Sequence, residues 1–226
     1  MEECKLDEQI LKKNLANIQS KIGEKDATLI AVTKFVDAET TRQVYQAGIK
    51  NLAENRTDKF LQKKEALSDL ASDIKWHFIG HLQSRQVKLI INEVDYLHSL
   101  DRISLAKEIQ KRANHPVNCF LQINISGEES KGGFEPNQAV SVIEELAKYD
   151  KITVIGLMTM APIDASPAQL HEIFEKLRTL QKEIASKKLP YAPCQELSMG
   201  MSRDYEIALE EGATFVRIGT AIYDEK

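Results

Sequence analysis

Cysteine is scarce in this sequence, with Cys4, Cys119 and Cys194 as the three examples among 226 residues. Their number is odd, they lie far apart and no pair has the CxxC spacing, so we expect neither a disulfide framework nor a zinc site. Cys119 falls within an apolar run, where a free thiol packs as a small hydrophobic side chain. This cysteine usage is typical of a reducing compartment and predicts a cytoplasmic protein.

Long apolar segments and an excess of basic residues are also missing. No run approaches the ~20 apolar residues that span a bilayer, and the charged N-terminus has no apolar signal-peptide core. The chain carries 30 basic and 34 acidic residues, for a formal net charge of −4. We therefore predict no membrane partner and, without a clustered basic face, no nucleic-acid partner.

What the chain does contain is a regular alternation of short apolar runs with amphipathic helical segments. Strands that alternate with helices of ~10–15 residues form βαβ units, and these units build a parallel sheet. Their repetition predicts an α/β fold, a single (β/α)8 TIM barrel. The alternative is an open doubly wound sheet, which favours a GxGxxG turn after the first strand, and that motif is absent. The apolar runs are residues 28–33, 51–55, 75–80, 94–100, 117–125, 152–160, 195–200 and 214–219.

The sequence predicts one domain over residues 1–226, because no linker, repeat or low-complexity tract divides the chain. An extra helix precedes the first strand, within an N-terminal segment of residues 1–25. Its apolar positions between residues 3 and 22 have helical spacing and must pack on the barrel. Residues 126–135, SGEESKGGFE, are rich in glycine and charge and are expected to form a mobile loop above the barrel.

Reactive groups in parallel barrels gather at the C-terminal ends of the strands, so polar residues there are the candidate site. Lys34 directly follows the apolar run LIAVT. If the strand end buries this amine, desolvation lowers its pKa, and the neutral amine is the form that condenses with an aldehyde. The alternative is that Lys34 simply extends from the strand end into solvent.

Two further motifs follow the last two strands, where barrels often bind phosphate. SMGMS, residues 198–202, offers hydroxyls and backbone N–H groups, and RIGT adds Gly219 and the Thr220 hydroxyl. These groups suit an anion. The plainer interpretation of SMGMS, which is compatible with the first, is that Ser202 is an ordinary helix N-cap.

Arg217 shares a strand face with Phe215 and Gly219, so a phosphate at Gly219 would place Arg217 inside the barrel. A buried guanidinium stays charged and needs a partner, which is either a ligand atom or a carboxylate such as Glu54. Met158 and Met160 are expected in the core, with one of them contacting a flat ligand ring, and we include Met158 in the site. The spacing of His77 and His81 provides no metal site.

The order of these motifs resembles that of the pyridoxal phosphate homeostasis (YggS/PROSC) family over about residues 29–222. The resemblance implies the fold of the N-terminal domain of alanine racemase. It implies that Lys34 holds pyridoxal 5′-phosphate (PLP) as a Schiff base and that Asn55 lines the site. It also implies that the phosphate rests on Ser198, Gly219 and Thr220, with Arg217 near the pyridine nitrogen. The matching motifs are AVTKF (31–35), AEN (53–55), WHFIGHLQS (76–84), QINIS (122–126), KGGF (131–134), GLMTM (156–160), LSMGMSRDYEIAL (197–209) and VRIGTAI (216–222).

Three positions depart from the family's usual pattern, namely Ala53 in the usual GEN triplet, Arg203 and Asp224. None of them belongs to the lysine or phosphate motifs, so the departures do not put cofactor binding in doubt. Arg203 would instead alter whatever approaches the rim of the site.

The expected function is intracellular PLP homeostasis without established turnover, and we assign no catalytic residue and no metal ligand. PLP enzymes that use the ring as an electron sink usually place an acid at the pyridine nitrogen, and Arg217 cannot act as that acid, although alanine racemase works with an arginine there. The alternatives are a racemase-like PLP enzyme of low activity and an aldolase-type Schiff base at Lys34 without PLP. A two-base racemase would need a second acid/base group, which we expect this barrel not to supply. A monomer that delivers PLP to apo PLP-dependent enzymes is the expected assembly.

Overall fold

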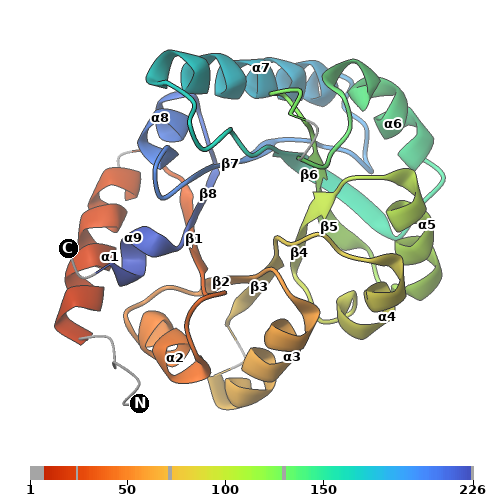
Figure 1. The fold of residues 1–226 in the computed structure, drawn as a ribbon. Coiled ribbons are helices and arrows are strands. Elements are labelled where there is room, and N and C mark those ends of the chain that lie inside the picture. The colour runs from red at the N-terminus through yellow and green to blue at the C-terminus, as the bar shows by residue number, and fades with distance from the viewer. Residues whose placement is uncertain (1–7, 24, 71–72, 129–130, 225–226) are drawn as a thin grey trace.

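The structure is a computed structural model that describes residues 8–23, 25–70, 73–128 and 131–224. Eight parallel strands pair in chain order and close where β1 meets β8 (Figure 1). This architecture confirms the predicted (β/α)8 TIM barrel. The strands are β1 (Thr28–Val32), β2 (Asn51–Glu54), β3 (Lys75–Phe78), β4 (Tyr96–Leu100), β5 (Val117–Gln122), β6 (Ile152–Met158), β7 (Glu196–Met201) and β8 (Phe215–Ile218).

Helices cover the outside of the barrel and bury the outward face of every strand (Figure 1). The helical segment between β3 and β4 is divided into a 3-10 turn, Ser84–Gln86, and the short helix α4. No helix in the described parts of the chain has the length and apolar character to cross a bilayer. The helices are α1 (Glu8–Gly23), α2 (Ala38–Gln46), α3 (Thr57–Ala66), α4 (Val87–Ile90), α5 (Ile103–Arg112), α6 (Ala139–Leu146), α7 (Pro167–Ser186), α8 (Tyr205–Glu210) and α9 (Thr220–Tyr223).

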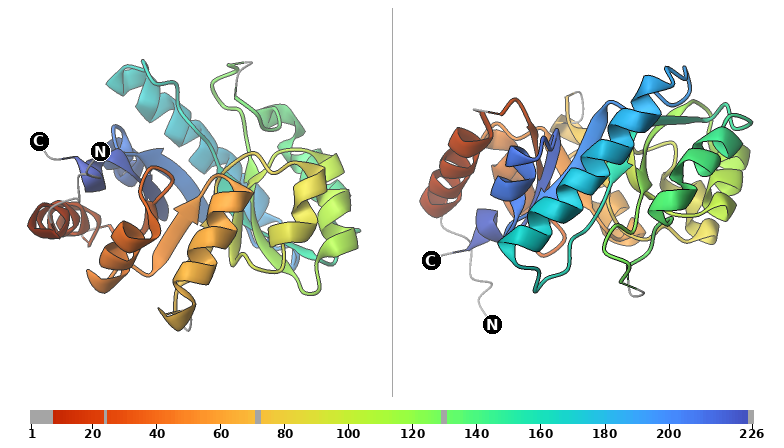
Figure 2. Two further views of the ribbon diagram at one scale, coloured as in Figure 1. Left: turned by 60° about the horizontal axis from the view of Figure 1, so that its bottom comes forward. Right: turned by 90° about the horizontal axis from the view of Figure 1, so that it is seen from above.

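The N-terminal helix α1 packs against α9 and β1 at the edge of the molecule (Figure 2). It buries four aliphatic side chains at helical spacing, Leu11, Leu15, Ile18 and Ile22. On its polar side, the Asn14 amide donates to the carbonyl oxygens of Ile222 and Asp224 at 3.1 and 2.9 Å. The predicted N-terminal helix is therefore present over residues 8–23, while residues 1–7 and 24 of that prediction lie outside the described residues.

The barrel has two cores of different chemistry. Between the sheet and the helices lies a continuous layer rich in leucine, isoleucine and valine, as expected for parallel strands buried on both faces. Inside the barrel, the aliphatic cluster of buried side chains is small and comprises Ile30, Val32 and Ala53. Aromatic and imidazole rings fill the interior beside it, with His98 stacked on Phe120 at 4.3 Å between ring centroids and His77 stacked on Tyr96 at 4.5 Å.

The segment expected as a mobile loop is tied to the end of β5. Phe134 pairs with Ile123 as an isolated parallel bridge, and the Asn124 side-chain amide donates to the carbonyl oxygens of Glu128 and Lys131. A side chain at Gly133, which has φ 126°, would come within 2.9 Å of the Gln122 carbonyl oxygen. The KGGF motif thus needs glycine so that this segment can dock on β5, and its mobility stays a prediction.

Gly200, at the centre of the SMGMS motif, has both a left-handed backbone and a tight contact. Its φ is +90°, and an added Cβ would lie 2.6 Å from the Cβ of Ala208 on α8. Gly48 has a similar φ of +94° but nothing within 4 Å of an added Cβ. The two glycines therefore share the same left-handed backbone conformation and differ in the packing around them.

We expect Gly48→Ala to lower the free energy of unfolding by about 1–2 kcal/mol, the cost of a left-handed alanine. Gly200→Ala should cost a further ~1–3 kcal/mol because α8 must move away from β7. Urea unfolding of both variants and the parent measures the difference. Equal destabilisation by the two substitutions would show that α8 moves away from β7 without a measurable loss of free energy.

Candidate functional site

The closure of the barrel places the ends of the first and last strands side by side. Ile30 pairs with Arg217 and Ala31 with Ile218 in the β1–β8 register. Gly219 follows β8, and a Cβ added to it would lie 3.4 Å from both the Cβ and the carbonyl oxygen of Val32. The predicted residues Lys34 and Gly219 are therefore brought to neighbouring positions at the same end of the barrel.

Lys34 lies in a turn after β1, and its side chain is exposed. The strand ends at Val32, and the Val36 N–H donates to the Thr33 carbonyl oxygen at 3.0 Å, which turns the chain away from the barrel wall. The Lys34 Nζ lies 4.7 Å from the ring centroid of Phe35, itself 74% exposed. The expectation that the strand end buries this amine is wrong, because the strand stops two residues earlier.

Ser202 provides the hydroxyl that meets Gly219. Its Oγ accepts hydrogen bonds from the backbone N–H groups of Gly219 at 3.2 Å and Ala221 at 3.3 Å. Thr220 lies between these two donors and is exposed. Because the Ser202 Oγ accepts from both N–H groups, its own O–H can donate to an anion after β7 and β8, and we name Ser202, Gly219, Thr220 and Ala221 the anion cradle.

Ser198 is not part of the anion cradle, although we had predicted it as a phosphate ligand. It is fully buried in β7, and its Oγ bonds to Arg217 and His98 inside the barrel. The sequence held the signal that distinguishes the two serines. Ser202 lies four residues further along the chain, nearer the C-terminal end of β7, where parallel barrels place their binding groups.

Arg217 lies inside the barrel as predicted, but Glu54 is not its partner. The Arg217 Nη1 donates to Ser198 Oγ at 2.6 Å, and Nη2 donates to the Thr159 carbonyl oxygen at 2.9 Å. Burial lowers the pKa of the guanidinium to about 10, against a smaller opposing effect of Asp204. Among the residues described, no carboxylate lies within ion-pair distance of Arg217. Glu54 instead pairs with Lys63 on the outer face of the wall.

From Ser198 a row of hydrogen bonds crosses the barrel interior. His98 Nδ1 lies 2.8 Å from Ser198 Oγ, His98 Nε2 lies 2.9 Å from His77 Nδ1, and His77 Nε2 lies 3.0 Å from the Asn51 amide oxygen. We call this row, from Arg217 to Asn51, the interior chain. Sequence reasoning missed His98, although a histidine within the apolar run 94–100 was a visible signal.

Both histidines of the interior chain are neutral. Burial lowers the pKa of His77 to about 3, with a smaller effect from Lys75. Burial lowers the pKa of His98 well below its usual value, helped by His77 and Arg217. Because the Asn51 oxygen only accepts, each neutral imidazole must donate through Nε2 and accept at Nδ1. Ser198 then donates to His98 and accepts from Arg217, so every bond in the row has one direction.

Asn55 and Met158 lie at different depths. Asn55 is half-buried just after β2, and its carbonyl oxygen would be 2.0 Å from a Cβ added to Gly80. Met158 is buried at the end of β6 and pairs in register with Gln122 and Ser198. It therefore shares the inward face with Ser198, below the barrel mouth.

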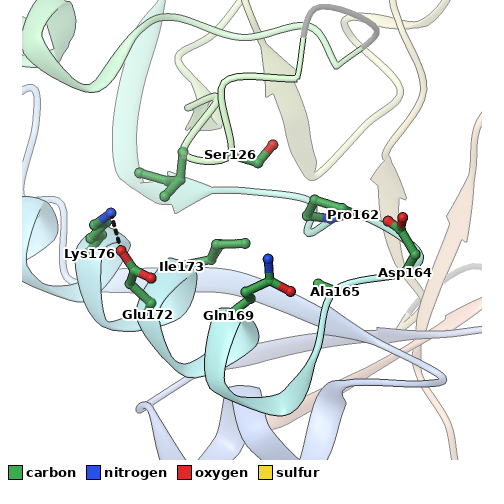
Figure 3. Close-up of a pocket in the computed structure, with 9 residues that line it drawn as sticks. Ser126, Pro162, Asp164, Ala165, Gln169, Glu172, Ile173 and Lys176 are labelled. Carbon is green, nitrogen blue, oxygen red and sulfur yellow. Dashed lines mark hydrogen bonds and ion pairs between the residues drawn. The ribbon is translucent and has the colours of Figure 1, made fainter.

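A separate hollow contains none of the predicted site residues (Figure 3). It lies between the segment after β5, the segment after β6 and the first half of α7. Lys176 and Glu172 form an exposed ion pair of 2.6 Å at one end. Its lining combines polar and apolar side chains, and Lys176 and Glu172 neutralise each other. The hollow lies beside β5 and β6, away from the strand ends that carry Lys34 and the anion cradle.

The neutral histidines predict a dependence of stability on pH. Their folded pKa values are depressed, so the unfolded chain binds more protons below the unfolded value of about 6.5. The free energy of unfolding should therefore fall by about 1 kcal/mol per pH unit for each buried histidine as pH drops from about 6 towards 4. Urea unfolding across this range measures the slope.

His77→Gln should reduce the slope, and His115→Gln, at an exposed histidine, should leave it unchanged. An unchanged slope in His77→Gln would mean that His77 already carries a proton in the folded protein.

Comparisons with known proteins identify the family of this chain. The family described as "Alanine racemase, N-terminal domain" matches residues 6–226. A pyridoxal phosphate homeostasis protein of Aquifex aeolicus is 44% identical over 207 residues, covering 90% of this chain and 89% of the relative.

Solved structures extend the likeness. The structure of PipY from Synechococcus elongatus with PLP bound is 30% identical in sequence and has a TM-score of 0.86. The match covers 94% of this chain and 99% of PipY. Alanine racemase of Corynebacterium glutamicum shares the fold, with 17% sequence identity and a TM-score of 0.80. The match covers 98% of this chain and 63% of the racemase chain. The chain belongs to the pyridoxal phosphate homeostasis protein family, built on the alanine racemase N-terminal domain fold.

Proposed function

We propose that this protein binds PLP at the barrel mouth, with Lys34 as the amine that joins the cofactor, and serves PLP homeostasis. One observation carries the proposal: an exposed lysine amine and an anion cradle follow adjacent strands, β1 and β8. The relatives named pyridoxal phosphate homeostasis proteins and the PLP-bound PipY structure support it. The amine and the aldehyde would form a C=N bond and release water.

The residues at the mouth fit the distinct parts of PLP. The phosphate suits the anion cradle, where the Ser202 hydroxyl and the N–H groups of Gly219 and Ala221 converge. Gly219 packs against Val32 without a side chain, which keeps the cradle open beside β1. Arg217, deeper in the barrel, suits the pyridine nitrogen. When bound, PLP supplies an aldehyde for condensation and a ring that can accept electrons.

The environment of Arg217 favours holding the cofactor over turning over a substrate. Arg217 is a donor only, and the interior chain occupies it with Ser198 and Thr159. A donor at the ring nitrogen leaves that nitrogen without a proton of its own, which weakens the ring as an electron sink. We therefore place racemase-like activity second. Adding alanine to the PLP-loaded protein and following exchange of the α-proton distinguishes the two functions.

The proposal includes a cytoplasmic monomer that passes PLP to apo PLP-dependent enzymes. The exposed position of Lys34 supports it, because an amine open to solvent leaves the C=N bond accessible to water or to a recipient's lysine. Mixing the loaded protein with an apo PLP-dependent enzyme and measuring recovered enzyme activity tests delivery. Recovery no faster than from an equal concentration of free PLP would contradict delivery.

Borohydride reduction tests the role of Lys34. The protein loaded with PLP should gain one reduced PLP group on the peptide that contains Lys34, as measured by mass spectrometry. Lys34→Ala should gain none there, because no amine follows β1. Lys59→Ala, at another exposed lysine, is the matched control and should behave like the parent. Labelling that is spread over several surface lysines would contradict a dedicated site.

The anion cradle predicts a difference between two ligands. Ser202→Ala should weaken PLP binding by about tenfold or more, the effect of losing a hydrogen bond to a charged group. Binding of pyridoxal, which lacks the phosphate, should change by less than about twofold, because it does not reach the cradle. Absorbance titrations measure both affinities. Equal weakening of PLP and pyridoxal would place the phosphate elsewhere.

A further inference from the structure

Thr33, the residue before Lys34, is tied at two points to a buried ion pair. The Lys63 Nζ donates to the Thr33 carbonyl oxygen at 2.6 Å, and the Thr33 hydroxyl donates to Glu54 Oε1 at 2.7 Å. Lys63 also donates to the same Glu54 oxygen. The carbonyl that Lys63 holds belongs to the peptide group that joins Thr33 to Lys34. The orientation of this peptide group helps to set the position of the Lys34 Cα, from which the side chain extends.

The ion pair lies behind the barrel wall, out of reach of a ligand at the mouth. Glu54 ends β2 and has 0% of its side chain exposed, while Lys63, on α3, has 4% exposed. Burial lowers the pKa of the Lys63 amine, and Glu54 acts in the opposite direction. Buried ion pairs of this kind often contribute less stability than apolar residues of similar volume. A positional role explains this pair better than a stabilising one.

Among the described residues, the second oxygen of the same carboxylate is buried without a hydrogen bond, as is a tyrosine hydroxyl at the end of α9. Glu54 Oε2 and the Tyr223 hydroxyl are both buried, and neither has a hydrogen-bond partner in the described structure. Burial raises the pKa of Tyr223, and the charge of Glu54 raises it further. Tyr223 ends α9, whose first residue, Thr220, belongs to the cradle. Glu54 is therefore bonded to Thr33, next to Lys34, and acts electrostatically on the helix that begins at the cradle.

We propose that Glu54 and Lys63 are positioning residues that hold the Lys34 turn in register with the anion cradle. The inference rests on the proposed function and assigns a role to Thr33, Glu54 and Lys63, which are all buried and outside the anion cradle. A ligand bound at both ends, by its phosphate and by its aldehyde, reacts quickly only when the amine stands at the right distance from the cradle. A small free aldehyde has no such requirement.

The test compares two aldehydes on a set of variants. Glu54→Gln/Lys63→Met removes both charges together and so avoids an unpaired buried charge. Thr33→Val removes the tethering hydroxyl at constant shape, and Thr33→Ser keeps the hydroxyl as the matched control. For each variant, unfolding by urea reports stability. Mass spectrometry of the Lys34 peptide reports the rates of reductive modification by PLP and by formaldehyde.

We expect the double variant and Thr33→Val to react with PLP at Lys34 at least about tenfold more slowly than the parent, while formaldehyde modifies Lys34 at the parent rate. Thr33→Ser should match the parent with both aldehydes. Parent rates with PLP in Thr33→Val and in a folded double variant would overturn the inference, as would equal slowing with both aldehydes. If the parent protein itself gains no PLP on Lys34, the proposed function fails instead.

Discussion

The pairing of β1 with β8 is the contact on which the site depends. It joins strands that lie nearly 200 residues apart in the sequence and sets Ile30 beside Arg217. Because all strands are parallel, this pairing brings the end of the first strand and the end of the last strand to one rim. Closure brings the turn that carries Lys34 and the anion cradle to the same rim of the barrel. In an open sheet, β1 and β8 would not pair, and no ligand could bridge their ends.

Polar groups lie on both sides of the barrel wall near this seam, and each set is nearly complete in its hydrogen bonds. Inside, the interior chain links Arg217 to Asn51 through two neutral histidines. Outside, Lys63 and Glu54 enclose Thr33. Buried polar groups are costly when unpaired, so such networks favour one arrangement of the strands that carry them. The site at the mouth therefore rests on a wall whose strand ends have little freedom to shift.

Each sequence motif contains residues that we propose to bind the ligand and residues that hold the framework together. In SMGMS, Ser202 faces the cradle, whereas Gly200 accommodates α8 and Ser198 bonds to Arg217. In AVTK, Lys34 faces solvent and Thr33 faces the buried pair. Each motif runs from a strand into the turn that follows it, so its members lie at different depths and point in different directions. A short motif thus combines side chains with unrelated tasks, and proximity in the sequence does not identify the ligand-binding member.

Sequence alone determined the eight-unit barrel and indicated the end of it where we propose the site, because the periodicity of strands and helices is a local property. It also indicated Lys34, Gly219, Thr220 and Arg217 as residues at strand ends or on inward faces. Tertiary structure decided the partners. Glu54 bonds to Lys63 and not Arg217, Ser198 lies below the cradle, and His98 completes the interior chain. These outcomes depend on strand register, bulges and the point where β1 ends, which follow from packing between distant segments and are not encoded in any local pattern.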